Sequence, residues 1–85
     1  MNPEMIERRK KMDLDFLEGE TLTGDRVYLK SQEYESNSDW PKKMGVAFRR
    51  PDGKFDVYDR DFDCTKLLNE RVLTAQQILE TWWVD

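Results

Sequence analysis

The chain of 85 residues contains no histidine and a single cysteine, Cys64. Without imidazole groups there can be no histidine-based acid–base catalysis, no Ser-His-Asp triad and no histidine-ligated metal site. One cysteine excludes an internal disulfide and a zinc site built from several thiolates. No segment approaches the roughly 18 consecutive apolar residues of a membrane-spanning helix, and no apolar signal-peptide core follows the basic residues 8–11. We therefore expect a cytoplasmic protein without a cofactor and without a membrane association.

Motifs of enzymes are also missing. The four glycines are isolated, so no glycine-rich phosphate loop is present. Asp56, Asp59 and Asp61 supply enough carboxylates for a two-acid hydrolase, but such a pair needs a concave, partly desolvated pocket. A domain of this length rarely provides one, so the sequence predicts a protein that is not an enzyme.

Charged residues make up 38% of the chain and aromatic residues 12%, and the formal net charge is -4. So many aromatic side chains are typical of a folded domain rather than of a disordered segment. The negative charge disfavours nonspecific binding to nucleic acid or to anionic membranes. The composition therefore predicts one folded domain, residues 1–85.

The segment around which the other elements are expected to pack is a β-hairpin over residues 44–59. Residues 44–50 and 54–59 alternate apolar and polar side chains, which is typical of strands. Pro51, Asp52 and Gly53 between them suit a type I turn followed by a glycine bulge with positive φ. One face of this hairpin is predicted to be apolar and to consist of Val46, Phe48, Phe55 and Val57.

A helix over residues 3–18 is predicted by Asn2 as its N-cap, by Pro3 at its first position and by an apolar stripe. Residues 25–30 alternate in the manner of a third strand. Asp63 or Thr65 is expected to cap a short helix through Leu67, Leu68 and Val72.

The C-terminal segment has the clearest helical pattern. Thr74 and Gln77 have the spacing of a capping box, and the apolar residues that follow recur on one helical face up to Trp83. The fold class is therefore predicted as α+β: a small three-stranded antiparallel sheet, made of hairpin 44–59 and strand 25–30, packed by an N-terminal and a C-terminal helix.

Residues 31–43 are expected to form a long polar surface loop, and long loops are often functional. Trp40 in this loop is interpreted first as a cap folded over the sheet edge, with a role in partner binding as the alternative. Asp59, Asp61, Asp63 and Glu70 have the spacing of a calcium loop, but Cys64 stands where such a loop needs glycine.

Binding through a surface is the favoured function. The second face of the sheet is predicted to carry Tyr28, Arg49, Asp56 and Tyr58, unless the N-terminal helix covers it, and Tyr and Arg are enriched at interface hot spots. One of the two adjacent C-terminal tryptophans is expected to be partly exposed. The predicted partner-binding residues are Tyr28, Trp40, Arg49, Asp56, Tyr58, Asp59, Asp61 and Trp83.

Two classes of binding function remain open at this point. In the first, the domain is a small acidic inhibitor, immunity-type protein or adaptor whose acidic segments 13–25 and 52–63 meet a basic surface of a partner protein. In the second and less favoured class, the tyrosines and arginines bind single-stranded nucleic acid. A homodimer formed through an exposed tryptophan is a further alternative. Short, highly charged chains of this kind are often encoded by bacterial viruses and mobile elements, which is an association without a mechanism.

Overall fold

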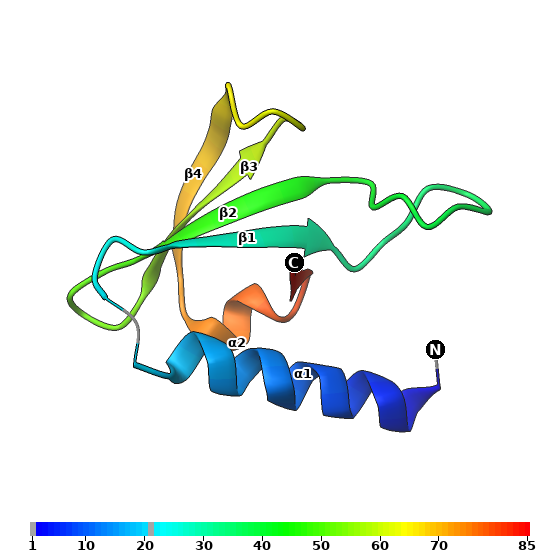
Figure 1. Ribbon diagram of the computed structural model, residues 1–85, viewed down its shortest axis with the longest axis horizontal. Helices are drawn as coiled ribbons and strands as arrows, with labels where there is room; N and C mark the ends of the chain where they lie inside the picture. Colours follow the sequence, from blue (N-terminus) through cyan, green and yellow to red (C-terminus); the bar gives the residue numbers. More distant parts are fainter. Residues whose placement is uncertain (1, 21) are drawn as a thin grey trace.

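The centre of the fold is a five-stranded antiparallel sheet with the strand order β4-β3-β2-β1-β5. The computed structural model describes residues 2–20 and 22–85. Figure 1 shows the sheet lying across α1, with α2 between them. The elements in chain order are α1 (Pro3–Glu18), β1 (Arg26–Ser31), β2 (Met44–Arg49), β3 (Phe55–Arg60), β4 (Leu67–Leu73), α2 (Ala75–Ile78) and β5 (Trp82–Val84).

The prediction of a three-stranded sheet was wrong because two segments read as helical are strands. Residues expected to form the short helix make β4, which pairs antiparallel with β3. Asn69 has a positive φ of 56° and lies within β4, where the pairing with β3 shifts register between Val57 and Asp59. This irregularity places an extra residue in β4 and hides the period of two, so the apolar spacing resembles that of a helix.

The predicted C-terminal helix is present only for its first turn. The capping box forms as expected, with Thr74 accepting from the Gln77 N–H and Gln77 accepting from the Thr74 N–H. However, α2 ends at Ile78, and Trp82 to Val84 pair antiparallel with β1 as strand β5. Because β1 would otherwise be an open edge, the extended conformation gains backbone hydrogen bonds that a continued helix would not provide.

The turn of the β2–β3 hairpin forms as predicted, but the predicted apolar face was wrong. Gly53 has φ 85°, and the N–H of Arg50 donates to the carbonyl oxygen of Lys54 at 2.8 Å. This closure places Ala47, and not Val46 or Phe48, opposite Val57. The buried core accordingly consists of Leu17, Val27, Leu29, Ala47, Phe55, Val57, Ala75, Ile78, Leu79 and Trp82.

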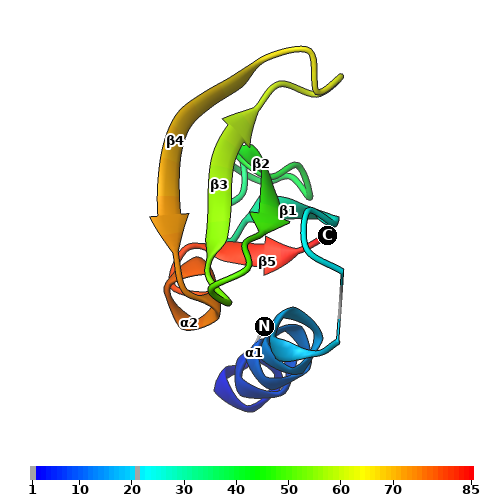
Figure 2. The same cartoon turned by 90° about the vertical axis from the view of Figure 1, so that its left-hand side faces the viewer.

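Both helices cover the same face of the sheet. Leu17 of α1 and Ile78 of α2 belong to one core cluster with side chains of β1, β2 and β3, and Figure 2 shows both helices on one side of the strands. The N-terminal helix therefore leaves the second sheet face uncovered. Its residues Met12 and Phe16 are themselves exposed.

Strand β5 is held at its outer edge by two side chains of α1. The guanidinium of Arg9 donates to the carbonyl oxygen of Val84 at 2.6 Å, and the carboxylate of Asp13 accepts from the Val84 N–H at 3.1 Å. Arg9 also contacts Asp13 at 3.1 Å. These side chains occupy the positions where a neighbouring strand would bond, so this edge of the sheet is closed.

The predicted loop 31–43 continues the β1–β2 hairpin beyond the sheet. Backbone bonds link Lys42 to Glu33 at 2.9 Å and Glu35 to Trp40 at 2.7 Å, and Tyr34 forms an isolated bridge with Pro41. We call residues 32–43 the ribbon; Figure 1 shows it projecting past the ends of β1 and β2.

Candidate protein-binding surface

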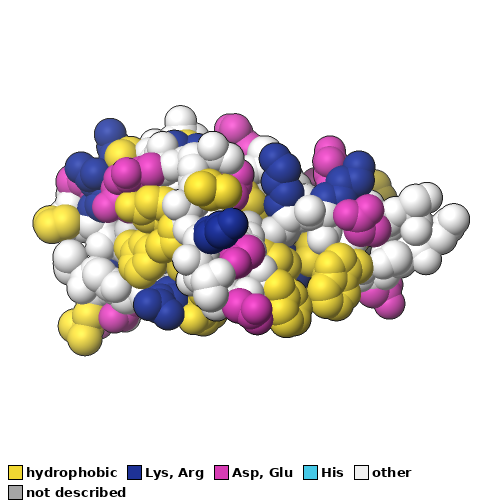
Figure 3. All heavy atoms as spheres, turned by 90° about the horizontal axis from the view of Figure 1, so that it is seen from above, with side chains coloured by type: hydrophobic (Ala, Val, Ile, Leu, Met, Phe, Trp, Pro, Cys, Tyr) yellow, Lys and Arg dark blue, Asp and Glu magenta, His cyan; other side chains and the backbone are white. Residues whose placement is uncertain are grey.

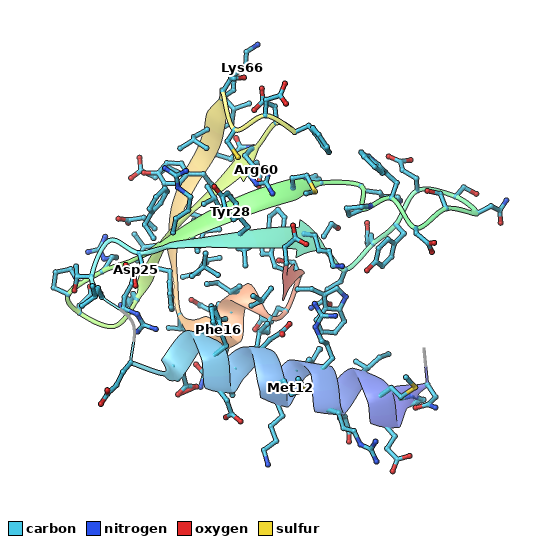
Figure 4. All side chains as sticks on the ribbon, in the orientation of Figure 1. Met12, Phe16, Asp25, Tyr28, Arg60 and Lys66 are labelled. Atoms are coloured by element: carbon cyan, nitrogen blue, oxygen red, sulfur yellow. The ribbon has the colours of Figure 1, made fainter. Side chains whose placement is uncertain are left out.

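The face of the sheet that points away from α1 and α2 is called the open face. The register of the strands assigns alternate residues to it, starting with Arg26 opposite Phe48 and Tyr28 opposite Val46. Figure 4 shows Tyr28 and Arg60 on this side of the sheet. Its side chains are Arg26, Tyr28, Lys30, Met44, Val46, Phe48, Asp56, Tyr58, Arg60, Leu67, Glu70 and Val72.

Aromatic rings and arginines on the open face contact one another. The guanidinium carbons of Arg60 and Arg26 lie 4.9 Å and 5.9 Å from the centroid of the Tyr28 ring, and Arg26 also donates to the Tyr28 hydroxyl at 3.1 Å. Phe48 and Tyr58 meet edge to face with centroids 5.9 Å apart. Such cation–π and edge-to-face contacts hold the rings in fixed orientations.

Two carboxylates on the open face have hydrogen-bond partners, Glu70 with Tyr58 and Asp56 with Arg50. Burial and a hydrogen bond with Glu70 raise the pKa of Tyr58 above its ordinary value. Asp56 lies 3.0 Å from Arg50. Both predicted residues, Tyr58 and Asp56, therefore lie on this face in defined hydrogen-bonded positions.

Trp40 and Phe62 form an exposed stacked pair beside the open face. Their ring centroids are 5.6 Å apart and the rings are inclined by 16°, yet 57% of Trp40 and 66% of Phe62 remain exposed. The expectation that Trp40 caps the core was therefore wrong. Figure 3, which views the molecule from above, shows hydrophobic side chains gathered in separate areas of this side.

Two predicted partner-binding residues lie elsewhere. Arg49 is on the core face, where it donates to the carbonyl oxygen of Leu17 and lies 5.0 Å from the Phe55 ring centroid. Trp83 is only 5% exposed, with the Arg9 guanidinium 5.3 Å from its ring centroid. Arg49 is half-buried on the core face, and both C-terminal tryptophans are buried, so the prediction of an exposed C-terminal tryptophan was wrong.

Asp59 and Asp61 have structural partners. Partial burial opposes ionisation of Asp59, but hydrogen bonds from Asn69 at 2.8 Å and Arg71 at 3.0 Å outweigh it, so the pKa of Asp59 lies below its ordinary value. The hydroxyl of Thr65 and backbone N–H groups donate to Asp61 and likewise lower its pKa. Asp61 thus caps the β3–β4 turn, and the prediction of a helix capped by Asp63 or Thr65 was wrong because the segment continues as strand β4.

Two adjoining clefts lie below and beside the ribbon. The first, of about 440 Å³, is lined by residues that include Gln32, Arg71 and Trp82, and the second, of about 470 Å³, includes Trp40 and Phe62. Both include Lys42, Lys43 and Asp59 in their walls.

Phe62, Arg60 and Phe48 are site residues that the sequence reasoning did not assign to the site. Phe48 was predicted to lie in the core with Phe55 and Val57, but the register of the hairpin pairs Val57 with Ala47 and Phe55 with Arg49. Phe62 lies between two aspartates, and an aromatic residue in so polar a segment is a signal of exposure that could have been used. Its contact with Trp40 depends on two connections that are distant in sequence, so no local pattern predicts the pair.

Within residues 2–20 and 22–85, no group of three His, Cys, Asp or Glu is arranged to hold a metal ion. No helix in the described chain has the length and apolar character needed to cross a membrane. Comparison with protein-family models, with curated proteins and with solved structures finds no match to this chain. The surfaces described above are therefore the basis for the proposal that follows.

Proposed function

We propose that the protein is a non-enzymatic binding module that attaches to another protein through its open face and the adjoining Trp40–Phe62 pair. The observation that supports this most strongly is that both helices cover one face, while the other carries ordered aromatic and arginine side chains. Tyr, Trp and Arg are the residue types that dominate interface hot spots. An inhibitor, immunity-type protein or adaptor would act by covering a surface of its partner in this way.

The balance of charge favours a protein partner over nucleic acid. A nucleic-acid surface gains its affinity from an excess of Lys and Arg. On the open face, the ribbon and the β3–β4 turn, acidic residues slightly outnumber basic ones. The basic residues are Arg26, Lys30, Lys42, Lys43, Arg60 and Lys66, and the acidic ones are Glu33, Glu35, Asp39, Asp56, Asp61, Asp63 and Glu70.

Several residues of the acidic segments 13–25 and 52–63 are already engaged within the fold. Segment 13–25 belongs to the end of α1 and the connection after it, and Asp13 in it is buried against β5. Within segment 52–63, Asp59 and Asp61 are engaged by Arg71 and by the β3–β4 turn. We therefore propose that aromatic contacts, more than a general attraction to a basic surface, drive the association.

The test is an affinity pull-down from a lysate of the organism that encodes the chain, run at low and high salt with nuclease in one arm. The wild type is compared with a Trp40→Ser/Phe62→Ser double variant. Met12→Ser is the matched control, since Met12 is also exposed and lies on α1, on the far side of the sheet from Lys66 in Figure 4.

We expect a stoichiometric protein that survives nuclease, is retained by the Met12→Ser variant and is lost by the double variant. Retention of nucleic acid alone, removed by nuclease or by salt, would show that the second binding class is correct. Light scattering of the purified wild type tests the homodimer: a dimer that the double variant abolishes would mean that the partner is a second copy.

A further inference from the structure

The cleft beside the Trp40–Phe62 pair has one apolar wall. This cleft of about 470 Å³ lies where the ribbon meets the β3–β4 turn, and Trp40, Met44, Phe62 and Leu68 contribute to its lining. Its volume falls within the roughly 300–1,000 Å³ typical of ligand-binding pockets. Trp40, Phe62 and Leu68 are all exposed large hydrophobic residues. Filling the cleft with an apolar side chain would remove this surface from water, which stabilises a complex.

The charged residues of the lining are mostly basic, in a chain whose net charge is -4. Lys42, Lys43 and Arg60 line the cleft together with one carboxylate, that of Asp59. Asp59 is already bonded to Asn69 at 2.8 Å and to Arg71 at 3.0 Å. Its negative charge is therefore balanced before any ligand arrives.

The charges available to a ligand are those of the two lysines. The side chain of Arg60 is only 6% exposed and donates to the carbonyl oxygen of Gly45 at 2.9 Å. Lys42 forms a long ion pair with Glu33, at 3.8 Å between Nζ and Oε2, and both of these side chains are more than half exposed. Lys43 is exposed and makes no ion pair within 4 Å among the residues that the structure describes, although its charge acts on Asp59 at longer range and contributes to lowering the pKa of that carboxyl.

We infer that this cleft binds an acidic segment of the partner protein, in which a large apolar side chain is flanked by Asp or Glu. The apolar side chain enters between the Trp40–Phe62 pair and Leu68, and the flanking carboxylates reach Lys42 and Lys43. This inference rests on the proposed protein-binding function and specifies the chemistry of the partner. Charge-assisted hydrogen bonds from lysine would orient the segment, and the apolar contact would supply most of the affinity.

A single-stranded nucleic acid fits the same cleft less well. Asp39 precedes Trp40, and Asp61 and Asp63 flank Phe62. A phosphate chain running past the aromatic pair would approach these carboxylates, whereas a peptide presents its charges only where the lysines are. The two rings also stack on each other, so each has one face fewer for a base.

The test is selection of a phage-displayed random-peptide library on the immobilised protein, followed by binding measurements and amide chemical-shift mapping with the enriched peptides. A Lys42→Glu/Lys43→Glu variant is compared with Lys10→Glu/Lys11→Glu, which reverses two adjacent exposed lysines on α1. We expect enrichment of acidic peptides with one large apolar residue and shifts confined to the cleft. Affinity should fall about tenfold or more in the first variant and remain within about twofold in the second.

Four results would overturn the inference. Peptides could be enriched without acidic residues, or their binding could survive Lys42→Glu/Lys43→Glu and instead shift amides of β1 and β3 around Tyr28 and Tyr58. A selection that enriches no peptide would equally contradict the inference. So would an oligothymidylate of about ten nucleotides that binds this cleft more tightly than the peptides do. The pull-down with Trp40→Ser/Phe62→Ser decides the proposed function separately, because a folded partner can bind the open face without any acidic segment.

Discussion

Gly45 lies under the indole ring of Trp82, and the absence of a side chain there allows the ring to pack against β2. A Cβ atom at this position would lie 2.9 Å from both Cη2 and Cζ3 of Trp82 and 3.2 Å from the carbonyl oxygen of Tyr58. Because both neighbours belong to packed parts of the sheet and core, neither can move without disturbing other contacts.

We predict that Gly45→Ala lowers the free energy of unfolding by about 1–3 kcal/mol through this overpacking. Urea denaturation followed by tryptophan fluorescence measures the change. Trp82→Leu serves as the partner substitution in a double-mutant cycle, since it removes the ring that the methyl group meets. If Gly45→Ala lowers the free energy of unfolding by the same amount in the Trp82→Leu background as in the wild type, the steric explanation is incorrect.

Asp59 is predicted to make stability depend on pH. Its folded-state pKa lies below the ordinary value of 3.8, so its ionised form is stabilised by folding. This contribution is present above about pH 4 and is lost as the pH falls through the lowered pKa of the folded state. Asp59→Asn should lower the free energy of unfolding at neutral pH by about 1–3 kcal/mol, because Arg71 loses a charged acceptor.

The measurement is urea denaturation of wild type and Asp59→Asn over a series of pH values. The difference between the two proteins should narrow below the ordinary pKa of 3.8. A difference that stays constant down to acid pH would show that the ionised carboxylate has no special role.

At the level of elements, the two edges of the sheet differ. Strand β5 has only three residues, but Arg9 and Asp13 bind the backbone of Val84 from outside. Strand β4 has seven residues with mostly exposed side chains, and no side chain among residues 2–20 and 22–85 is shown to bond its outer edge as Arg9 and Asp13 bond that of β5. Its bulge at Asn69 interrupts regular pairing, which is one way in which natural sheets protect an open edge.

Removing the Asp13 carboxylate is predicted to loosen β5. Asp13→Ala leaves the Val84 N–H without its acceptor and removes the carboxylate partner of Arg9, whose guanidinium keeps the Val84 carbonyl oxygen. Because the setting is partly buried, we expect a loss of about 2–4 kcal/mol in the free energy of unfolding. Arg8→Ala is the control, because the Glu4–Arg8 pair is about three-quarters exposed on both sides and should cost less than about 0.5 kcal/mol. Hydrogen exchange of residues 82–84 should rise only in Asp13→Ala, and equal effects of the two variants would contradict this role for Asp13.

The elements that were predicted correctly are those whose signals are local. Helix α1 follows from Asn2, Pro3 and its apolar stripe, and the turn at Gly53 and the capping box at Thr74 follow from residues within a few positions of one another. Strands β4 and β5 depend on pairing with β3 and β1, which overrides the helical spacing of their apolar residues. The three-residue turn at 51–53 also determined the β2–β3 register, so the correct core face was deducible from the sequence.

In the candidate site too, positions that depend on local patterns were predicted correctly, and positions that depend on contacts between distant segments were not. Tyr28 and Tyr58 were assigned to the exposed face by simple alternation along single strands. Arg49 was assigned to the wrong face because its position depends on the register between strands. The Trp40–Phe62 pair joins two connections separated by a whole hairpin, and no periodic pattern in either connection indicates the contact.

For the molecule as a whole, residues 34–41 of the ribbon project beyond the sheet, whereas Gln32 at its base donates to the carbonyl oxygens of Leu79 and Trp82. None of the residues 32–43 belongs to the buried core cluster. Replacing residues 34–41 by Asn-Gly, which favours a tight hairpin turn, should change the free energy of unfolding by less than about 1 kcal/mol. The same variant should lose the partner bound by the wild type in the pull-down, and a loss of cooperative unfolding would instead assign the ribbon a structural role.

The bonds between α1 and β5 also have a kinetic consequence. They join residues 71 and 75 positions apart in the chain, whereas β1 to β4 form a meander of neighbouring strands. Contacts between distant segments carry a large loop-closure entropy and tend to form late, after local hairpins have assembled. Asp13→Ala should therefore unfold faster than the wild type while refolding at nearly the same rate, so that the chevron plot shifts in its unfolding arm. The β1–β4 meander therefore determines mainly the folding rate. The bonds from Arg9 and Asp13 to Val84 determine mainly the unfolding rate, and so the lifetime of the folded state.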